Sequence, residues 1–168
     1  MAARSGDQVA FARLVDLEGP RAYRLARAIL RSSQDAEEAV QEAFLHAWRE
    51  LPRLRDIASW SAWFRRITVR AAIDRGRRRP RIREIDLGTF EPSDASQANL
   101  EVEARADVAR ALRFLAPEDR ALLTLRFLDD LEIPDVAAAL GVPAGTVKSR
   151  LSRLLGRLRA DAAIEDVR

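Results

Sequence analysis

LGVPAGTVKSRLSRLLGRLR, residues Leu140 to Arg159, is the stretch on which the interpretation of the whole chain depends. It begins as a tight turn at Gly141, Val142 and Pro143 and then becomes a helical pattern that carries small hydroxyls and basic residues. Its leucines recur at three- and four-residue steps, which is the spacing of one face of an α-helix. The stretch is either a DNA-reading helix or a basic surface helix that closes a small bundle.

The residues around the turn favour a helix-turn-helix over residues 133 to 158. Ala137 is small where two helices must approach closely, and Gly141 reaches a positive φ easily. Four apolar residues are predicted to face inward and to fix the crossing angle: Val136, Leu140, Val142 and Val147. Six polar residues are left on or near the outer faces of the second helix: Thr146, Lys148, Ser149, Arg150, Ser152 and Arg153. Such a helix fits the major groove, where arginine binds guanine through two hydrogen bonds. A bundle helix would explain the leucines but not the alanine–glycine spacing.

Apolar residues recur at helical spacing through almost the whole chain, and no strand pattern competes. The clearest stripe runs from Ala36 to Leu51, with Ser33 as its predicted N-cap and Pro52 as its stop. Upstream, two shorter stripes predict helices that are separated or bent at Gly19 and Pro20. The predicted fold is therefore all-α.

The domain organisation follows from a gap in this pattern. A helix that starts near Trp60 is predicted to end near Gly76, and residues of about 83 to 105 then lack a sustained period and indicate a flexible linker. Beyond the linker, a helical module resumes at Val108, and Pro117 opens its next helix. We expect two small helical domains, at about residues 7–82 and 106–164.

Composition excludes several classes of protein. The chain of 168 residues contains no cysteine, so neither a disulfide framework nor a thiolate metal site is possible. It has no signal-peptide pattern and no run of 18 apolar residues, so we expect a cytoplasmic protein without membrane insertion. His46 is the single histidine, and no nucleophile–base set or metal-ligand cluster is visible, so we expect neither an enzyme nor a cofactor.

The net charge of the chain is +3, but the charged residues are distributed unevenly along it. Nine arginines and one acid lie between Arg65 and Arg83, and the sign reverses between Glu84 and Glu103. A block of like charge is either a solvated surface or a site for a polyanion. The second basic cluster, Lys148 to Arg159, favours the polyanion.

Two further features of the sequence each allow two interpretations. The outward face of the long helix shows five residues that suit either ordinary solvent exposure or docking of a basic partner helix: Asp35, Glu38, Gln41, Glu42 and Leu45. Trp60, Trp63 and Phe64 lie beside arginines, an arrangement that stacks unpaired bases or simply fills a core. Trp60 is the better candidate for an exposed ring.

Four motifs in order resemble bacterial extracytoplasmic-function sigma factors, the small two-domain sigma subunits of RNA polymerase. The motifs are DAEEAVQEAFLHAW (35–48), WFRRITVRAAIDRGRRR (63–79), LAPEDRALLTLRF (115–127) and VAAALGVPAGTVKSRL (136–151). The resemblance covers nearly the whole chain. It implies a sigma region 2-like four-helix domain followed by a sigma region 4-like helix-turn-helix domain.

The resemblance also implies a division of labour between the domains. The core polymerase would be bound, through the clamp region of its β′ subunit, by Asp35, Glu38, Gln41, Glu42 and Leu45. The minus-ten promoter element would be contacted by Arg55, Trp60, Arg66, Arg70, Asp74, Arg75, Arg77 and Arg78. The minus-thirty-five element would be contacted by Arg120, Thr146, Lys148, Ser149, Arg150, Ser152 and Arg153. Further implied partners are the β flap of the polymerase and an anti-sigma factor.

The chain departs from the family pattern at a few positions. Arg70 stands where asparagine is common, which leaves the minus-ten base preference open, and Thr68 replaces a usual alanine. Glu132 and Pro134 alter the usual start of the first helix of the helix-turn-helix. The alternative function is a stand-alone helix-turn-helix regulator, which would leave the acidic face and the arginine block without a role.

Overall fold

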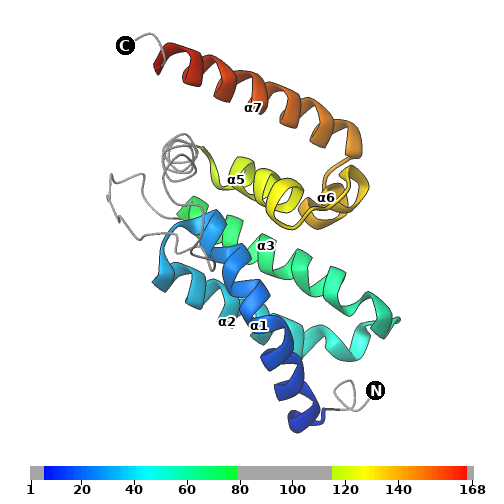
Figure 1. Cartoon of the computed structure of the whole chain (residues 1–168). Coiled ribbons are helices and arrows are strands. Elements are labelled where there is room, and N and C mark those ends of the chain that lie inside the picture. Colours follow the sequence, from blue (N-terminus) through cyan, green and yellow to red (C-terminus); the bar gives the residue numbers. More distant parts are fainter. Residues whose placement is uncertain (1–5, 79–114, 166–168) are drawn as a thin grey trace, which may run out of the picture.

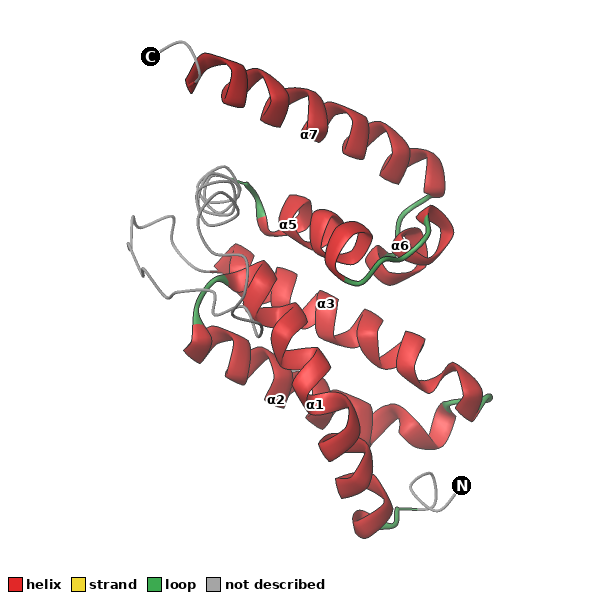
Figure 2. Cartoon of the chain, in the orientation of Figure 1, coloured by secondary structure: helices red, strands yellow, loops and turns green. Residues whose placement is uncertain are grey.

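The computed structural model describes residues 6–78 and 115–165 (Figure 1). Within these two ranges the chain forms helices and short connecting loops and no strand, as the all-α prediction requires (Figure 2). The predicted linker and the helix expected around Val108 lie outside the described residues.

The N-terminal domain consists of three long helices, α1 (Gln8–Leu30), α2 (Ser33–Glu50) and α3 (Trp60–Arg78). Short 3₁₀ turns, η2 (Leu51–Arg53) and η3 (Ile57–Ser59), connect α2 to α3. The helices pack on one another through small residues of α2, since Ala36, Ala39, Ala43 and Ala47 are all fully buried. The α2 helix ends just before Pro52, as predicted.

Two local predictions in this domain are wrong. The N-cap of α2 is Ser32 and not Ser33, because the Ser32 side chain accepts a hydrogen bond from Asp35 N at 3.2 Å. The separation of two helices at Gly19 and Pro20 is also wrong, since α1 continues through both residues as one helix, whereas the alternative, a bend at this point, stays a prediction. The helix is packed on both sides of Pro20: the ring centroids of Phe11 and Trp48 lie 4.8 Å apart, and Ile29 is fully buried.

The C-terminal domain contains α5 (Pro117–Leu123), the π-helical turn η5 (Thr124–Leu128), α6 (Ile133–Leu140) and α7 (Ala144–Glu165). Proline lies in the first turn of both α5 and α6, where its missing N–H leaves no partner unsatisfied. Gly141 ends α6 with φ 69°, and its N–H donates to Ala137 O. The predicted helix-turn-helix is therefore present as α6, a glycine turn and α7.

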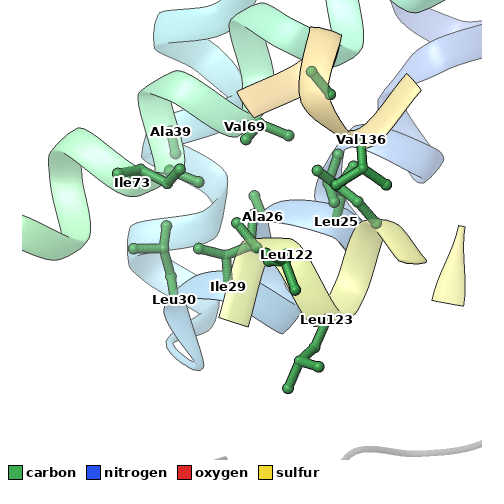
Figure 3. Close-up of a cluster of buried hydrophobic side chains, with 14 of the residues drawn as sticks. Leu25, Ala26, Ile29, Leu30, Ala39, Val69, Ile73, Leu122, Leu123 and Val136 are labelled. Carbon is green, nitrogen blue, oxygen red and sulfur yellow. The ribbon is translucent and has the colours of Figure 1, made fainter. Parts of the chain in front are cut away.

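The two domains share one apolar core. The helices α5 and α6 lie across α1 and α3, and α7 lies on their far side (Figure 1). Leu122 and Val136 are fully buried against Leu25, Ala26 and Ile29 (Figure 3). A second buried cluster, which contains Trp60 and Phe64, belongs to the N-terminal domain by itself.

The shared core predicts a measurable loss of stability. Leu122→Ala removes a fully buried side chain at the domain contact and should lower the free energy of unfolding by about 2–5 kcal/mol in urea denaturation. The matched control, Leu17→Ala, removes an exposed leucine of α1 and should change it by about 0.5 kcal/mol or less. Equal effects of the two variants would contradict the shared core.

Candidate functional site

The predicted reading surface lies on α7. Val147 and Leu154 are buried against the rest of the domain, and this packing leaves the opposite side of the helix in solvent. Five of the predicted residues are exposed there: Thr146, Lys148, Ser149, Ser152 and Arg153. Arg150 is half-buried. The Arg153 Nε–H donates to Ser149 O at 3.3 Å, which holds this guanidinium along the helix surface.

Arg120 does not join that surface. Its Nε–H donates to Ile29 O of α1, and its Nη1 donates to Leu115 O at 2.7 Å. Burial, with a smaller contribution from the nearby Arg31 charge, lowers the pKa of Arg120 to about 10, so the side chain stays charged at neutral pH. In this arrangement Arg120 joins the two domains, and its hydrogen bonds go to backbone carbonyls.

A second basic surface follows α3. Arg66, Arg70, Arg77 and Arg78 are exposed at helical spacing, and Asp74 lies among them, 3.9 Å from Arg77. Arg55 is exposed in the loop before the helix. Most of the predicted minus-ten residues therefore lie together on one element and its preceding loop.

The prediction of an exposed Trp60 ring is wrong. Trp60 is 5% exposed and stacks on Phe64 with ring centroids 5.2 Å apart and planes 4° apart. It begins α3, directly behind the turn in which Ser59 N donates to Asp56 O, so its ring enters the second buried cluster. Its Nε1–H is buried without a hydrogen-bond acceptor among the described residues. The neighbouring Trp63 is only half-buried.

Arg75 lies within the acidic face of α2. Its Nε donates to Asp35 Oδ1 at 3.0 Å, its Nη2 donates to Glu38, and its Nη1 lies 3.9 Å from Glu42 Oε1. Burial acts to lower the pKa of Arg75, but the hydrogen bonds to Asp35 and Glu38 and their charges outweigh it and raise the pKa. Because the side chain is only 24% exposed and surrounded by carboxylates, this geometry favours the acidic face over the DNA surface.

The remaining residues of the acidic face point into solvent. Gln41 and Glu42 are exposed, and Leu45 is 58% exposed beside them. An exposed leucine bordered by carboxylates is the composition of a docking surface for a basic amphipathic partner. The sequence-predicted set from Asp35 to Leu45 is thus brought together, with Arg75 as an addition that the sequence did not indicate.

Ion pairs between the domains were also missed by sequence reasoning. Asp129 Oδ2 lies 3.2 Å from Arg21 Nη2 and 3.3 Å from Arg65 Nε, although the Arg65 N–H is not aimed at that oxygen. The Arg77 Nε–H donates to Glu118 at the start of α5. No spacing within one helix indicates these pairs, because each joins residues of different domains that only the packing of the helices brings together.

These features define a two-domain helical protein with a helix-turn-helix whose second helix exposes basic and hydroxyl side chains. Two family models match the chain, Sigma-70 region 2 over residues 14–82 and Sigma-70 region 4 over residues 105–158. The ECF RNA polymerase sigma factor SigM of Mycobacterium tuberculosis is 38% identical over 154 residues, covering 92% of this chain and 78% of that protein. The ECF RNA polymerase sigma-E factor of Escherichia coli K12 is 33% identical over 163 residues, covering 89% of this chain and 85% of that protein.

Two solved structures agree with this result. CnrH in complex with the cytosolic domain of CnrY has a TM-score of 0.65 and 26% identity, covering 96% of this chain and 93% of that chain. The sigma factor RpoE of Bartonella quintana in complex with the anti-sigma factor NepR has a TM-score of 0.66 and 25% identity, covering 90% of this chain and 95% of that chain. The chain belongs to the extracytoplasmic-function family of RNA polymerase sigma factors. It is a sigma subunit.

The residues described include no helix that is long and apolar enough to cross a bilayer.

The buried position of Trp60 predicts how its variants behave. Trp60→Phe keeps the ring stack and removes an unpaired buried N–H, so it should change the free energy of unfolding by about 1 kcal/mol or less. Trp60→Ala should cost about 3–5 kcal/mol, because it leaves a cavity. Urea denaturation followed by circular dichroism measures both. Trp60→Ala as stable as the parent would indicate an exposed ring.

Proposed function

We propose that this sigma subunit docks on the core polymerase with the acidic face of α2 and reads promoter DNA with α7 and the arginines of α3. The observation that carries the proposal is the separation of charge. Acids and an exposed Leu45 lie together on α2 between Asp35 and Leu45, whereas α3 and α7 each carry several exposed arginines on one stretch of helix. A basic partner helix and a polyanion would therefore be attracted to different surfaces.

The docking surface would contact the clamp region of the polymerase β′ subunit. Asp35, Glu38, Gln41, Glu42 and Leu45 would form it, as the resemblance implies. Arg75 donates hydrogen bonds to Asp35 and Glu38 and lies 3.9 Å from Glu42, so we assign it to this surface as a positioning residue. The second domain would bind the β flap of the polymerase.

The minus-thirty-five element would be read in the major groove by α7. Arg153 and Arg150 are the candidates for guanine contacts, and each such contact discriminates by about 1–3 kcal/mol. Lys148 and the hydroxyls of Thr146, Ser149 and Ser152 would bind phosphates and fix the register.

The minus-ten element would be contacted by Arg55, Arg66, Arg70, Arg77 and Arg78, with Asp74 among them. The DNA opens when the protein binds unpaired bases better than paired ones, because that difference shifts the equilibrium between duplex and open strands. Stacking stabilises the duplex by about 1.4 kcal/mol per base-pair step. Contacts between the protein and an unpaired base contribute about 1–3 kcal/mol per base, which is enough to offset this loss of stacking. Trp60 would take part only after a rearrangement that exposes its ring.

We assign no bond-forming or bond-breaking step to this chain, and we place it in the cytoplasm, where RNA polymerase works. Two of its structural relatives were solved with partners, CnrH with the cytosolic domain of CnrY and RpoE with the anti-sigma factor NepR. We therefore propose that an anti-sigma factor also binds this chain.

Run-off transcription with purified core polymerase tests the proposal. Start sites mapped genome-wide in the reconstituted reaction would supply the cognate promoters. Initiation that depends on the added chain is the expected result. Operator binding without initiation from any promoter would instead support the stand-alone regulator.

Charge reversal on α2 should weaken polymerase binding selectively. Glu38→Arg replaces a carboxylate of the docking surface and should lower the affinity for core polymerase by about tenfold or more, which corresponds to about 1.4 kcal/mol. The control is Glu37→Arg, which makes the same charge change at the next, exposed position of the helix. Pull-down with core polymerase compares the two, and equal binding by both variants would remove Glu38 from the docking surface.

Removal of the Arg153 side chain from α7 should weaken the recognition of the minus-thirty-five element. Arg153→Ala should weaken binding of the reconstituted holoenzyme to a cognate promoter by about 1–3 kcal/mol if the residue contacts a base. The loss should be much smaller on a promoter with a scrambled minus-thirty-five element. Arg159→Ala removes an exposed arginine two turns further along α7 and serves as the control. The same loss on both promoters would assign Arg153 to phosphate binding only.

A further inference from the structure

The packing of α2 on α3 places Arg75 beside the acidic face. Ala36 and Ala39 of α2 are fully buried, and they lie in one cluster with Ala72 and Ile73 of α3 (Figure 3). Small side chains at a helix contact let the two helix axes approach closely. The apolar contact between the two helices therefore already brings a cation next to the carboxylates of α2.

The carboxylates of the acidic face are not equally available. Both oxygens of Glu38 accept hydrogen bonds, Oε1 from Gln34 Nε2 at 3.3 Å and Oε2 from Arg75. Asp35 Oδ1 accepts from Arg75 Nε at 3.0 Å, and its side chain is only 17% exposed. Glu42 lies 3.9 Å from Arg75 Nη1, and no hydrogen-bond donor within residues 6–78 and 115–165 reaches its carboxylate. The negative charge is thus covered at the start of α2 and open at Glu42.

The open end of the acidic face also carries the apolar side chain. Leu45 follows Glu42 by three residues, a spacing at which helical side chains are neighbours. The Glu42 side chain is 52% exposed, and Leu45 is 58% exposed. The accessible part of the face therefore combines one carboxylate with one leucine. A complementary partner carries a cation beside an apolar side chain on one side of a helix.

Asp35 and Glu38 are closed to a partner by this arrangement. A partner cation can bind either of them only in place of the Arg75 guanidinium, which then loses hydrogen bonds that it already makes. Since one ion pair replaces another of the same kind, the exchange contributes little free energy. Glu42 remains, and a single exposed ion pair is weak by itself.

We propose that Arg75 determines the selectivity of docking. By covering Asp35 and Glu38, it leaves Glu42 and Leu45 as the accessible contacts, so that a basic amphipathic helix binds well and a purely cationic chain binds weakly. Selectivity of this kind comes from weakening the wrong partner and not from strengthening the right one. The inference rests on the proposed function for the identity of the partner, whereas the covering of the carboxylates is tested without polymerase.

Removal of the Arg75 charge should improve the binding of a purely cationic probe. The probe is a fluorescent lysine oligomer, and its affinity for the whole chain is measured by fluorescence anisotropy. Arg75→Gln should raise this affinity by at least about threefold, because two uncovered carboxylates each gain an exposed ion pair. The control, Arg13→Gln, makes the same charge change at an exposed position of α1 and should raise it much less.

Two further variants separate charge from local structure. Arg75→Lys keeps the charge but loses the planar guanidinium, so it should bind the lysine oligomer as the parent does. A merely structural role of the guanidinium would make Arg75→Lys behave like Arg75→Gln, and that result would overturn the proposal. Adding Glu38→Gln to Arg75→Gln removes one uncovered carboxylate and should return the affinity most of the way to the parent value. Circular dichroism melting curves check that each variant is folded.

Core polymerase supplies the second arm of the experiment. Leu45→Ala, at an exposed position, should weaken the binding of core polymerase by at least about threefold through lost apolar contact and leave the lysine oligomer unaffected. In Arg75→Gln, the ratio of the affinity for core polymerase to the affinity for the lysine oligomer should fall by at least about threefold, because the uncovered carboxylates favour the purely cationic chain.

The outcomes distinguish this inference from the proposed function. An unchanged affinity of Arg75→Gln for the lysine oligomer, or an equal gain for the oligomer and for core polymerase, would contradict the role of Arg75. Equal losses of both ligands in Leu45→Ala, or no loss of either, would contradict it as well. A parent chain that does not bind core polymerase would count against the proposed function, while the lysine oligomer would still test whether Arg75 covers the carboxylates.

Discussion

The burial of leucines and valines between the two halves of the chain is the constraint on which the rest of the structure depends. Leu122 and Val136 lie in the same cluster as Leu25 and Ile29, so the helix-turn-helix is oriented by α1 and α3 as much as by its own turn. This orientation decides which arginines face solvent. It also brings Arg120, Arg65 and other charged groups next to partners that neither domain would offer by itself.

Electrostatics divides the remaining surface. The carboxylates of α2 are close enough to one another to need a counter-charge, and Arg75 supplies it from α3. Most arginines of α3 and α7 outside this cluster remain at the surface, whereas Arg65 is largely buried beside Asp129. A protein with both kinds of surface can bind a basic protein and a polyanion together, as a sigma subunit must.

The sequence predicted the helices and the helix-turn-helix well, because apolar spacing, Gly141 and Pro117 are local signals. It placed the cap of α2 one residue too late, and it misjudged Pro20, since tertiary packing on both sides of a proline is invisible to a local pattern. The acidic face and the reading face were found from side-chain spacing on single helices. Buried Trp60, the position of Arg75 and the pairs made by Asp129 and Glu118 depend on which helices meet, and no spacing rule contains that information.

The last turn of α3 places three successive residues against three different neighbours. Arg75 contacts α2, Gly76 contacts Pro117, and Arg77 contacts Glu118. Coupling between binding sites is reciprocal in free energy. Any coupling between binding at the α2 carboxylates and binding at Arg77 would run through this turn and would be equal in both directions. One turn of helix thus forms a short physical path between the acidic face of α2 and the first turn of α5.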